Sequence, residues 1–256
     1  MELKEMLVVI PHSGILIPCE IPVDSLSNDF PRLTRNVDWY TIWLYNFHDS
    51  LGNLSLTFPY CSIILEANRD PEDIDSSVPL KDSFGEPIYR AKHNPGLELR
   101  QFLSKKYLRK FHQSIARALR FRTFMLDAHS TITAKGVADN QIELMNYQIS
   151  PQNGERVQFC PDSFIETYAE ELIKRLPGIK VSVNESKYHY VYGHVCGAHS
   201  INAATRVGNR VPAILQETNQ NLYMNTDRTP NLEAIETLRR VFAEALYEMM
   251  ITVKRV

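Results

Sequence analysis

Short apolar runs alternate with amphipathic stretches along the chain. Runs of four or five residues rich in apolar or β-branched side chains predict buried strands at 7–10, 54–58, 62–65, 123–126, 180–183 and 213–216. Between them, apolar residues recur at three- and four-residue spacing, which predicts helices over 39–51, 97–122 and 163–176. A last helix is predicted over 230–253, with Pro230 in its first turn, where the missing N–H is tolerated.

This alternation predicts an α/β protein, a three-layer α/β/α sandwich with a mixed, largely parallel sheet. A chain of 256 residues is within reach of one hydrophobic core, so we expect a single domain over 1–256. Residues 70–95 and 188–210 are rich in Gly, Pro, Asp, Ser and His and are predicted to be long loops. Loops of this length often carry function, because they overhang the strand ends where α/β sheets collect ligands.

The composition argues against several classes of partner. Hydrophobic residues make up 44% and charged residues 23%, which are ordinary globular values, and no run is long enough to span a membrane. A formal charge of -2 offers no long-range attraction to nucleic acid or to an anionic membrane. The basic residues between 105 and 122 lie opposite an apolar stripe, which is typical of a solvated helix face. We therefore expect a small-molecule substrate and a monomer or small homo-oligomer.

The cysteines and the first residues indicate the compartment. Cys19, Cys61, Cys160 and Cys196 are far apart and form no CxxC pair, so neither a zinc cluster nor a disulfide framework is predicted. The apolar run at 7–10 is too short for a signal peptide. These features favour a cytoplasmic protein.

Polar clusters stand directly after, or at the end of, four of the predicted strands. They contain His12, Asn68 with Arg69, Asp127 with His129, and Glu217. A parallel sheet brings the carboxyl ends of its strands to one edge, so these distant residues are expected to converge on one crevice.

Two of the converging residues are histidines, which indicates a metal site. His12 and His129, with one carboxylate and an open position, form the donor set of catalytic zinc, although other divalent metals accept the same ligands. Asp38 is the favoured third ligand and Glu66 the alternative. Asp38 is about as well explained as the N-cap of the helix over 39–51, and Glu66 as a partner that orients Arg69 or His129.

The other polar residues suit amide hydrolysis. Asn68 and Arg69 offer an amide and a guanidinium fork to a substrate carboxylate and a developing oxyanion, although Arg69 with Asp70 as a structural pair is the alternative. Glu217 is the predicted general base, and Asp127, two residues before His129, is placed to fix its tautomer. Tyr89 and His112 are weaker pocket candidates, for which packing in the core is favoured.

These motifs, in this order, resemble those of the zinc carboxypeptidase and aspartoacylase group. Their residue sequences are more similar to those of the N-formylglutamate amidohydrolase family. The similar segments extend from residue 11 to residue 224. They are Pro11-His12-Ser13-Gly14, Asp38-Trp39, Asn68-Arg69-Asp70-Pro71, Phe84-Gly85-Glu86-Pro87-Ile88-Tyr89-Arg90, Asp127-Ala128-His129-Ser130, Glu217-Thr218-Asn219 and Leu222-Tyr223-Met224.

The resemblance implies a phosphorylase/hydrolase-like fold, a bound Zn²⁺, and release of formate from N-formyl-L-glutamate. It also implies His12, His129 and a carboxylate as metal ligands, Asn68 and Arg69 on the substrate, and Glu217 on water. The chain departs from the family's usual Gly-Gly-Tyr-x-Thr-Arg segment, since it has Asn202 at the basic position and Arg206 four residues later. We therefore name Asn202 and Arg206 as substrate-binding candidates and expect an altered substrate preference.

Two further functions remain open. The same chemistry would serve an amidase that trims a peptide or cell-wall fragment, with the histidine-rich residues 188–199 accepting the larger group. The missing glutamate one turn after His12 and the altered segment at 197–202 would also suit a binding protein that has lost catalysis. Substrate profiling and a Glu217→Gln variant distinguish these possibilities.

Overall fold

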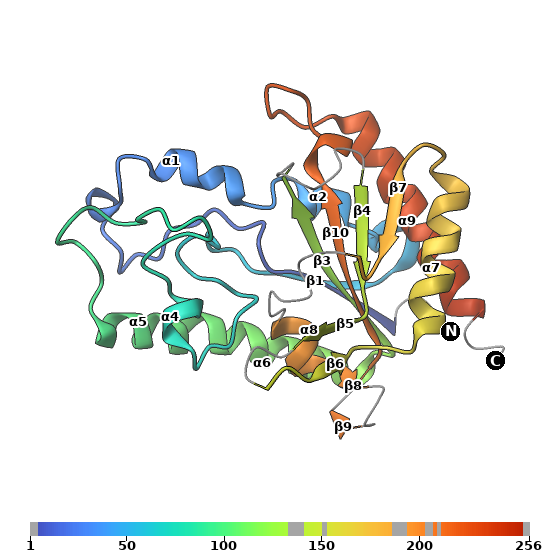
Figure 1. The fold of residues 1–256 in the computed structure, drawn as a ribbon, viewed down its shortest axis with the longest axis horizontal. Helices are drawn as coiled ribbons and strands as arrows, with labels where there is room; N and C mark the ends of the chain where they lie inside the picture. Colours follow the sequence, from blue (N-terminus) through green and yellow to red (C-terminus); the bar gives the residue numbers. More distant parts are fainter. Residues whose placement is uncertain are drawn as a thin grey trace.

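A six-stranded sheet separates two layers of helices (Figure 1). The computed structural model describes residues 5–132, 141–149, 153–185, 194–202, 207–208 and 211–252. Neighbouring strands across the sheet are, in order, β2 (Leu54–Thr57), β1 (Met6–Ile10), β3 (Phe124–Thr131), β10 (Ala213–Asn219), β4 (Gln141–Met145) and β7 (Lys180–Val183). The first four strands are parallel, β4 is antiparallel to β10, and β7 is parallel to β4. The fold is the mixed, largely parallel α/β/α sandwich that the alternation predicts.

Each face of the sheet has its own apolar core, because side chains alternate between the faces along a strand. Val9 and Met125 belong to the core that includes residues of α5 (Leu97–Leu103) and α6 (Arg109–Ala118). Val8 and Leu126 belong to the opposite core, which includes residues of α7 (Asp162–Arg175) and α9 (Leu232–Thr252). No helix in the described part of the chain is long and apolar enough to cross a bilayer.

The remaining elements are short. A π turn over Ser104–Leu108 joins α5 to α6, which makes 97–118 one continuous helical stretch. Segments on either side of β2 project beyond its edge of the sheet and carry α1 and α4 (Figure 1). The other short helices and strands are α1 (Phe30–Leu33), α2 (Thr41–Leu44), α3 (His48–Leu51), α4 (Ile74–Ser77), α8 (His194–His199), β5 (Tyr147–Ile149), β6 (Arg156–Gln158), β8 (Ile201–Asn202) and β9 (Val207–Gly208).

The strand predicted at 62–65 is wrong. The backbone N–H groups of Ile64 and Leu65 donate hydrogen bonds to the Cys61 carbonyl, at 3.0 and 2.9 Å. These bonds form a tight turn in place of a strand. Both side chains are fully buried in the core under α5 and α6. The run is apolar because it is buried, and burial alone does not distinguish a strand from a buried turn.

The helix predicted over 39–51 is divided into α2 and α3. Tyr40, with a φ of 61°, precedes α2, and Tyr45 and Phe47 follow it with both side chains completely buried. Two buried residues at a spacing of two do not share one face of a helix, so the chain leaves the helical conformation between them.

Other element boundaries shift by a few residues. α9 begins at Leu232, and Asn231 caps it by accepting from the Ala234 N–H at 3.1 Å, so Pro230 precedes the cap instead of occupying the first turn. β3 and β10 continue three to five residues beyond the predicted ends, to Thr131 and Asn219. The predicted loop at 70–95 contains α4, and the described part of 188–210 contains α8, β8 and β9.

Candidate metal and substrate site

The candidate site is the polar end of one sheet face. Glu217 on β10 pairs in register with His129 on β3, and Leu215 pairs with Asp127. Paired residues of parallel strands point to the same side, so Asp127, His129 and Glu217 share the face whose other end belongs to the apolar core under α5 and α6. The extension of β3 and β10 therefore places these residues on strands, where the backbone ladder fixes their positions.

His12 reaches the same place from the loop after β1. Gly14 lets this loop approach the chain after β2, because a Cβ at Gly14 would lie 2.3 Å from the carbonyl carbon of Pro59. A hydrogen bond from Leu16 N to Pro59 O, 3.1 Å long, fixes the contact. Glycine in the Pro-His-Ser-Gly motif is thus required by the close approach of two backbones.

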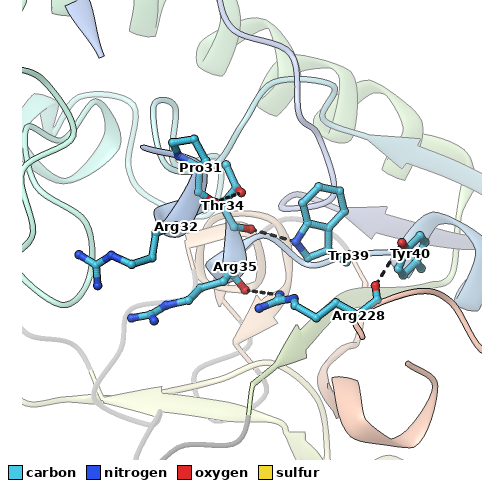
Figure 2. Close-up of a pocket in the computed structure, with 7 residues that line it drawn as sticks. All are labelled: Pro31, Arg32, Thr34, Arg35, Trp39, Tyr40 and Arg228. Atoms are coloured by element: carbon cyan, nitrogen blue, oxygen red, sulfur yellow. Dashed lines mark hydrogen bonds between the residues drawn. The ribbon is translucent and has the colours of Figure 1, made fainter. Parts of the chain in front are cut away.

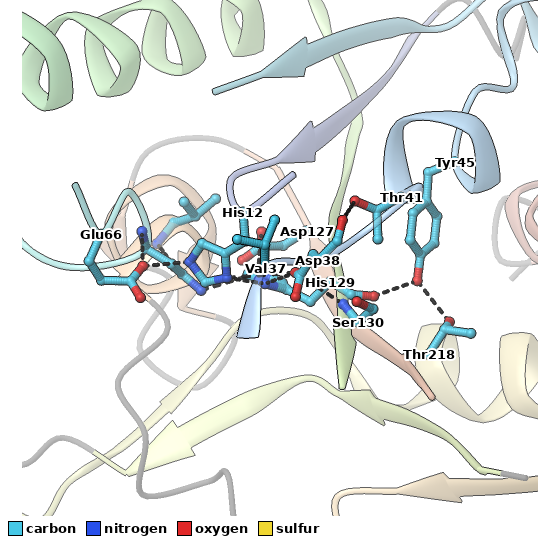
Figure 3. Close-up of polar contacts among 12 residues, drawn as sticks. His12, Val37, Asp38, Thr41, Tyr45, Glu66, Asp127, His129, Ser130 and Thr218 are labelled. Atoms are coloured by element: carbon cyan, nitrogen blue, oxygen red, sulfur yellow. Dashed lines mark hydrogen bonds and ion pairs between the residues drawn. The ribbon is translucent and has the colours of Figure 1, made fainter. Parts of the chain in front are cut away.

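Three candidate ligand atoms form a nearly equilateral triangle, and Figure 3 draws the residues that carry them. His12 Nδ1 lies 3.2 Å from His129 Nδ1 and 3.6 Å from Asp38 Oδ2, and His129 Nδ1 lies 3.5 Å from Asp38 Oδ2. A tetrahedral zinc ion with bonds of 2.0–2.1 Å has ligand atoms about 3.3–3.4 Å apart. The three donors therefore fit an ion of this size without rearrangement, and they form a candidate metal-binding group among the described residues.

Each imidazole is oriented through its other nitrogen. His12 Nε2 lies 2.5 Å from Glu66 Oε1, and His129 Nε2 lies 3.0 Å from Asp127 Oδ1. A carboxylate at Nε2 favours the tautomer that carries its proton there, which leaves the Nδ1 lone pair for a metal. Sequence reasoning paired Glu66 with Arg69 or His129, and the structure pairs it with His12.

Asp38 contacts both imidazoles and does not cap a helix. Its Oδ2 accepts a hydrogen bond from the Ser130 N–H at 3.1 Å, and α2 begins only after Tyr40, so the interpretation of Asp38 as an N-cap is wrong. Gln220 Nε2 donates to the Val37 carbonyl at 3.0 Å, and the Tyr223 hydroxyl donates to the Trp39 carbonyl at 3.0 Å. The backbone on both sides of Asp38 is therefore anchored to the segment after β10.

Burial and opposite charges shift the pKa values in the site. Burial lowers the pKa of His12, but Glu66 and Asp38 outweigh it and raise that pKa to about 9. Burial raises the pKa of Asp38, but His12 and His129 outweigh it and lower the pKa to about 2. Burial also raises the pKa of Glu66, but His12 and Arg69 outweigh it and lower the pKa to about 2. Carboxylates that stay ionised beside two imidazoles create a negative potential, which favours a bound cation.

Glu217 has the opposite shift. Burial, with further contributions from Asp38 and Glu143, raises its pKa to about 8, although His129 and His12 oppose the change. Its Oε2 atom is buried and has no hydrogen-bond partner among the described residues. A carboxyl group poised near neutral pH and not tied to a neighbour suits proton transfer.

A cavity of about 280 Å³ opens beside His12. Arg69 lies in its wall and donates through Nη1 to the Asn68 carbonyl at 3.0 Å. Asn68 is 4% exposed, and its amide oxygen accepts from the Val195 N–H at 2.8 Å while Nδ2 lies 3.1 Å from His129 Nε2. Arg69 is therefore placed to meet a ligand, whereas Asn68 supports the site from behind. The lining residues are His12, Ser62, Ile63, Glu66, Arg69, Asp75, Ser76, Pro79, Lys81, Asp82 and Ser83.

Tyr89 and His112, for which packing was the favoured interpretation, are both buried, and two other candidates lie outside the described residues. Tyr89 is 2% exposed in the apolar core, and its hydroxyl has no partner among the described residues, so it is a packing residue and not part of this cavity wall. His112 is also buried, 3.0 Å from His199 Nε2 through Nδ1 and 2.9 Å from the Ala67 carbonyl through Nε2. Arg206 and the side chain of Asn202 lie outside the described residues.

Sequence reasoning missed the polar residues of β4 and β7. Glu143 pairs across the antiparallel strands with Glu217, and Gln141 Nε2 donates to Glu143 Oε1 at 2.8 Å and to Ser182 Oγ at 2.7 Å. Gln141, Glu143 and Ser182 are each at most 5% exposed. Polar residues at 141 and 143, alternating with Ile142 and Leu144, carry the two-residue period that could have identified β4 and its polar face.

Comparisons with known proteins place the chain in a family. The family model described as N-formylglutamate amidohydrolase matches residues 4–224. The crystal structure of an N-formylglutamate amidohydrolase from Ralstonia eutropha has a TM-score of 0.74 at 19% identity, over 99% of this chain and 95% of the other, so it has the same fold.

Two other solved structures align with TM-scores below 0.5. A bacteriophage poly-gamma-glutamate hydrolase aligns over 98% of this chain and 85% of its own, with 9% identity and a TM-score of 0.42. An N-acetylmuramoyl-L-alanine amidase from Nostoc punctiforme aligns over 96% and 97%, with 13% identity and a TM-score of 0.36. No curated protein matches the sequence. On the family match across most of its length, this chain belongs to the N-formylglutamate amidohydrolase family.

Proposed function

We propose that this protein is a metal-dependent hydrolase that removes the acyl group from a small N-acyl amino acid, with N-formyl-L-glutamate as the first candidate. The observation that carries the proposal is the triangle of His12 Nδ1, His129 Nδ1 and Asp38 Oδ2, with sides of 3.2–3.6 Å, beside a 280 Å³ cavity. Membership of an amidohydrolase family supports the reaction class.

His12, His129 and Asp38 would hold the metal. Two imidazoles and one carboxylate suit Zn²⁺, although iron, cobalt or manganese accepts the same ligands. A divalent cation held there would polarise the amide carbonyl and make water more acidic. Glu66 and Asp127 keep both Nδ1 atoms directed at the shared position through their contacts with His12 and His129 Nε2.

Glu217 moves the proton. Its carboxylate accepts a proton from the attacking water as the new C–O bond forms, and it returns a proton to the leaving nitrogen as the C–N bond breaks. The products are a carboxylic acid, formate for a formyl group, and a free amino acid. Burial favours the protonated form of Glu217, which helps this residue hold the proton between the two steps.

Arg69 binds the substrate's carboxylate. Its guanidinium lies in the wall of the cavity that also contains His12 and Glu66. A planar fork of N–H donors recognises a carboxylate through two parallel hydrogen bonds, so it selects acidic substrates and sets the orientation of the amide.

Four free cysteine thiols suit a reducing compartment, and we propose that the enzyme is cytoplasmic.

The test compares metal and turnover in the same samples. The protein is purified without chelator, its metals are quantified by elemental mass spectrometry, and formate release from N-formyl-L-glutamate is assayed for the wild type and for His12→Ala combined with His129→Ala. We expect one metal per wild-type chain, none in the double variant, and turnover only with metal. Metal without formate release would redirect the search to other N-acyl substrates, including peptide and cell-wall amides. A wild-type protein that binds no added zinc would contradict the proposal.

A further inference from the structure

A second cavity, of about 460 Å³, is formed by α1, the 3₁₀ turn Thr34–Asn36 and the turn before α9 (Figure 2). It shares no lining residue with the cavity beside His12. Its volume is within the range of small-molecule sites. The lining residues are Pro31, Arg32, Thr34, Arg35, Trp39, Tyr40 and Arg228.

The wall of this cavity is strongly positive. Arg32, Arg35 and Arg228 contribute three guanidinium groups, and no carboxylate is among the lining residues. Arg32 Nη2 lies 3.7 Å from Glu86 Oε2, on a side chain that is 49% exposed. Three guanidinium groups with no carboxylate in the lining form a concave surface that concentrates anions.

Hydrogen bonds hold the wall together. Arg228 Nη2 donates to the Arg35 carbonyl at 3.0 Å, and the Tyr40 hydroxyl donates to the Arg228 carbonyl at 3.4 Å. Trp39 Nε1 donates to the Thr34 carbonyl at 2.9 Å. Segments almost two hundred residues apart are thereby joined at this point, and the bond from Arg228 uses only one of the five N–H donors that a guanidinium carries.

Two lining residues have an unfavourable backbone conformation. Tyr40 and Arg228 have φ values of 61° and 67°, in the left-handed region that favours glycine and asparagine. Both positions carry large side chains, and both residues line the cavity. Strain of this kind concentrates at ligand sites, where the side chain itself is needed.

We propose that this cavity binds a small polyanion with two or more adjacent negative groups, such as a diphosphate or a tricarboxylate. Guanidinium forks recognise phosphate and carboxylate oxygens in pairs, which explains the use of arginine at all three charged positions. Trp39 and Tyr40 add aromatic surface for a flat group attached to the anion. The residues that line this cavity are not among the proposed metal ligands, although Trp39 directly follows Asp38 in the chain.

The sequence allows a direct optical test. Trp39 and Trp43 are the only two tryptophans, so Trp43→Phe leaves Trp39, in the cavity wall, as the single fluorophore. Pyrophosphate, ADP and citrate are titrated into this protein at moderate salt, and each is repeated by calorimetry. We expect saturable binding of at least one probe with a Kd below roughly 1 mM. If ADP binds more tightly than pyrophosphate, Trp39 and Tyr40 contribute to recognition. If the two bind equally, the arginines alone account for it. Both outcomes support a polyanion site.

Variants locate the binding. Arg35→Ala combined with Arg228→Ala is expected to raise the Kd at least ~10-fold, because two charge-assisted contacts are lost. Arg35→Ala alone keeps the bond from Arg228 to the residue 35 carbonyl and provides a milder variant if the double variant does not fold. Arg120→Ala, at an exposed arginine on another element, is the matched control and should leave the Kd unchanged.

A last variant separates this site from the metal. These probes can chelate metals, so His12→Ala combined with His129→Ala is titrated as well, and it should bind the probe with the wild-type Kd. This variant abolishes the proposed hydrolysis and leaves the second cavity intact, so the two proposals fail independently. No saturable binding of any of the three probes, or a Kd unaffected by loss of Arg35 and Arg228, would overturn the polyanion site.

Discussion

The two faces of the sheet use the same strands for different purposes. On β3, Leu126 and Ala128 point into the apolar core under α7 and α9, whereas Asp127 and His129 point into the candidate site. One residue of displacement along the strand therefore separates a packed interior from an ionised cluster. We call the face with Leu126 and Ala128 the scaffold face, and the face with Asp127 and His129 the site face. The scaffold face stabilises the fold through apolar burial, whereas the site face holds buried charged groups that could bind a cation and a substrate.

Packing on the opposite face of the sheet also fixes the position of the site residues. Tyr45, from the scaffold side, donates its hydroxyl to the His129 carbonyl at 2.9 Å and lies 2.8 Å from Thr218 Oγ1 (Figure 3). The backbone that carries His129 is thus fixed from the opposite face. Rigid packing on one side of a strand holds the functional side chains on the other.

Glu217→Gln should have the largest effect and should affect the site face alone. The amide cannot accept the proton, so we expect kcat for formate release to fall by a factor of about 10²–10⁴. The side chain keeps its shape, and its buried Oε2 has no partner to lose among the described residues, so stability should not decrease. Turnover and thermal unfolding are measured on the same preparation, together with metal content. Unchanged kcat at full metal occupancy would remove Glu217 from the mechanism.

Leu126→Ala affects the scaffold face in the same strand. Leu126 is fully buried, so its truncation should cost about 2–5 kcal/mol of unfolding free energy through lost burial and a residual cavity. We expect near-normal kcat at low temperature, because Asp127 and His129 still point to the other face. Urea unfolding and turnover at 10 °C distinguish the effects. A kcat that falls as far as it does in Glu217→Gln would show that the two faces are not separable.

The pH dependence of the metal-free protein tests the charge on the site face. The pKa of His12 is raised from 6.5 to about 9 by Glu66 and Asp38, against burial. The stabilisation is therefore complete below pH 6.5 and is lost as the pH rises through about 9, with an upper limit of ~3 kcal/mol. Zinc affinity should rise over the same window, because the ligand must release its proton.

This pH effect has a matched control. In His12→Gln, treated with chelator, the loss of thermal stability between pH 6.5 and 9 should be smaller than in the wild type. The pKa of Glu217 is raised to about 8, so its titration also changes stability over this pH range. Measuring thermal stability against pH with and without His12 in the Glu217→Gln background removes this effect. Equal slopes with and without His12 would contradict the assignment of the raised pKa to this residue.

Sequence reasoning names the three residues of the candidate metal-binding group, but it misplaces several elements around them. His12, Asp38 and His129 could be named because metal chemistry limits the residue types and because strand ends converge in a parallel sheet. The exact contacts could not be predicted. Glu66 meets His12 through a turn that was predicted to be a strand, and only the folded chain shows which imidazole it reaches.

The errors share one physical cause, which is tertiary burial. Ile64 and Leu65 are apolar in a turn because the core covers them, and Tyr45 and Phe47 interrupt a helix because both must be buried. Local periodicity contains no information on which neighbour provides that burial. The arginine-rich cavity was missed for the same reason, because Arg228 is brought to Arg35 only by the fold.

The smallest expected effect comes from a carboxylate outside the site. Burial raises the pKa of Glu20, but Lys106 and Tyr107 outweigh it and lower the pKa to about 2. His12 and Arg69 lower the pKa of Glu66 in the same direction. Glu20 and Lys106 have side chains that are 19% and 38% exposed, so water screens their ion pair. Glu20→Gln should therefore cost less than ~1 kcal/mol at pH 7, and the difference from the wild type should vanish as the pH falls from 4.5 towards 2.

Urea unfolding of both proteins at pH 7 and pH 4 measures this difference, and Glu66→Gln is the matched comparison in the buried site. If Glu20→Gln costs as much as Glu66→Gln, the burial of the charge does not determine its energetic weight, and the distinction between the ionised site face and the solvated surface would have to be abandoned. A small cost for Glu20 and a large cost for Glu66 would support this distinction, because water screens the charge of Glu20 whereas the carboxylate of Glu66 is paired with His12 in the site.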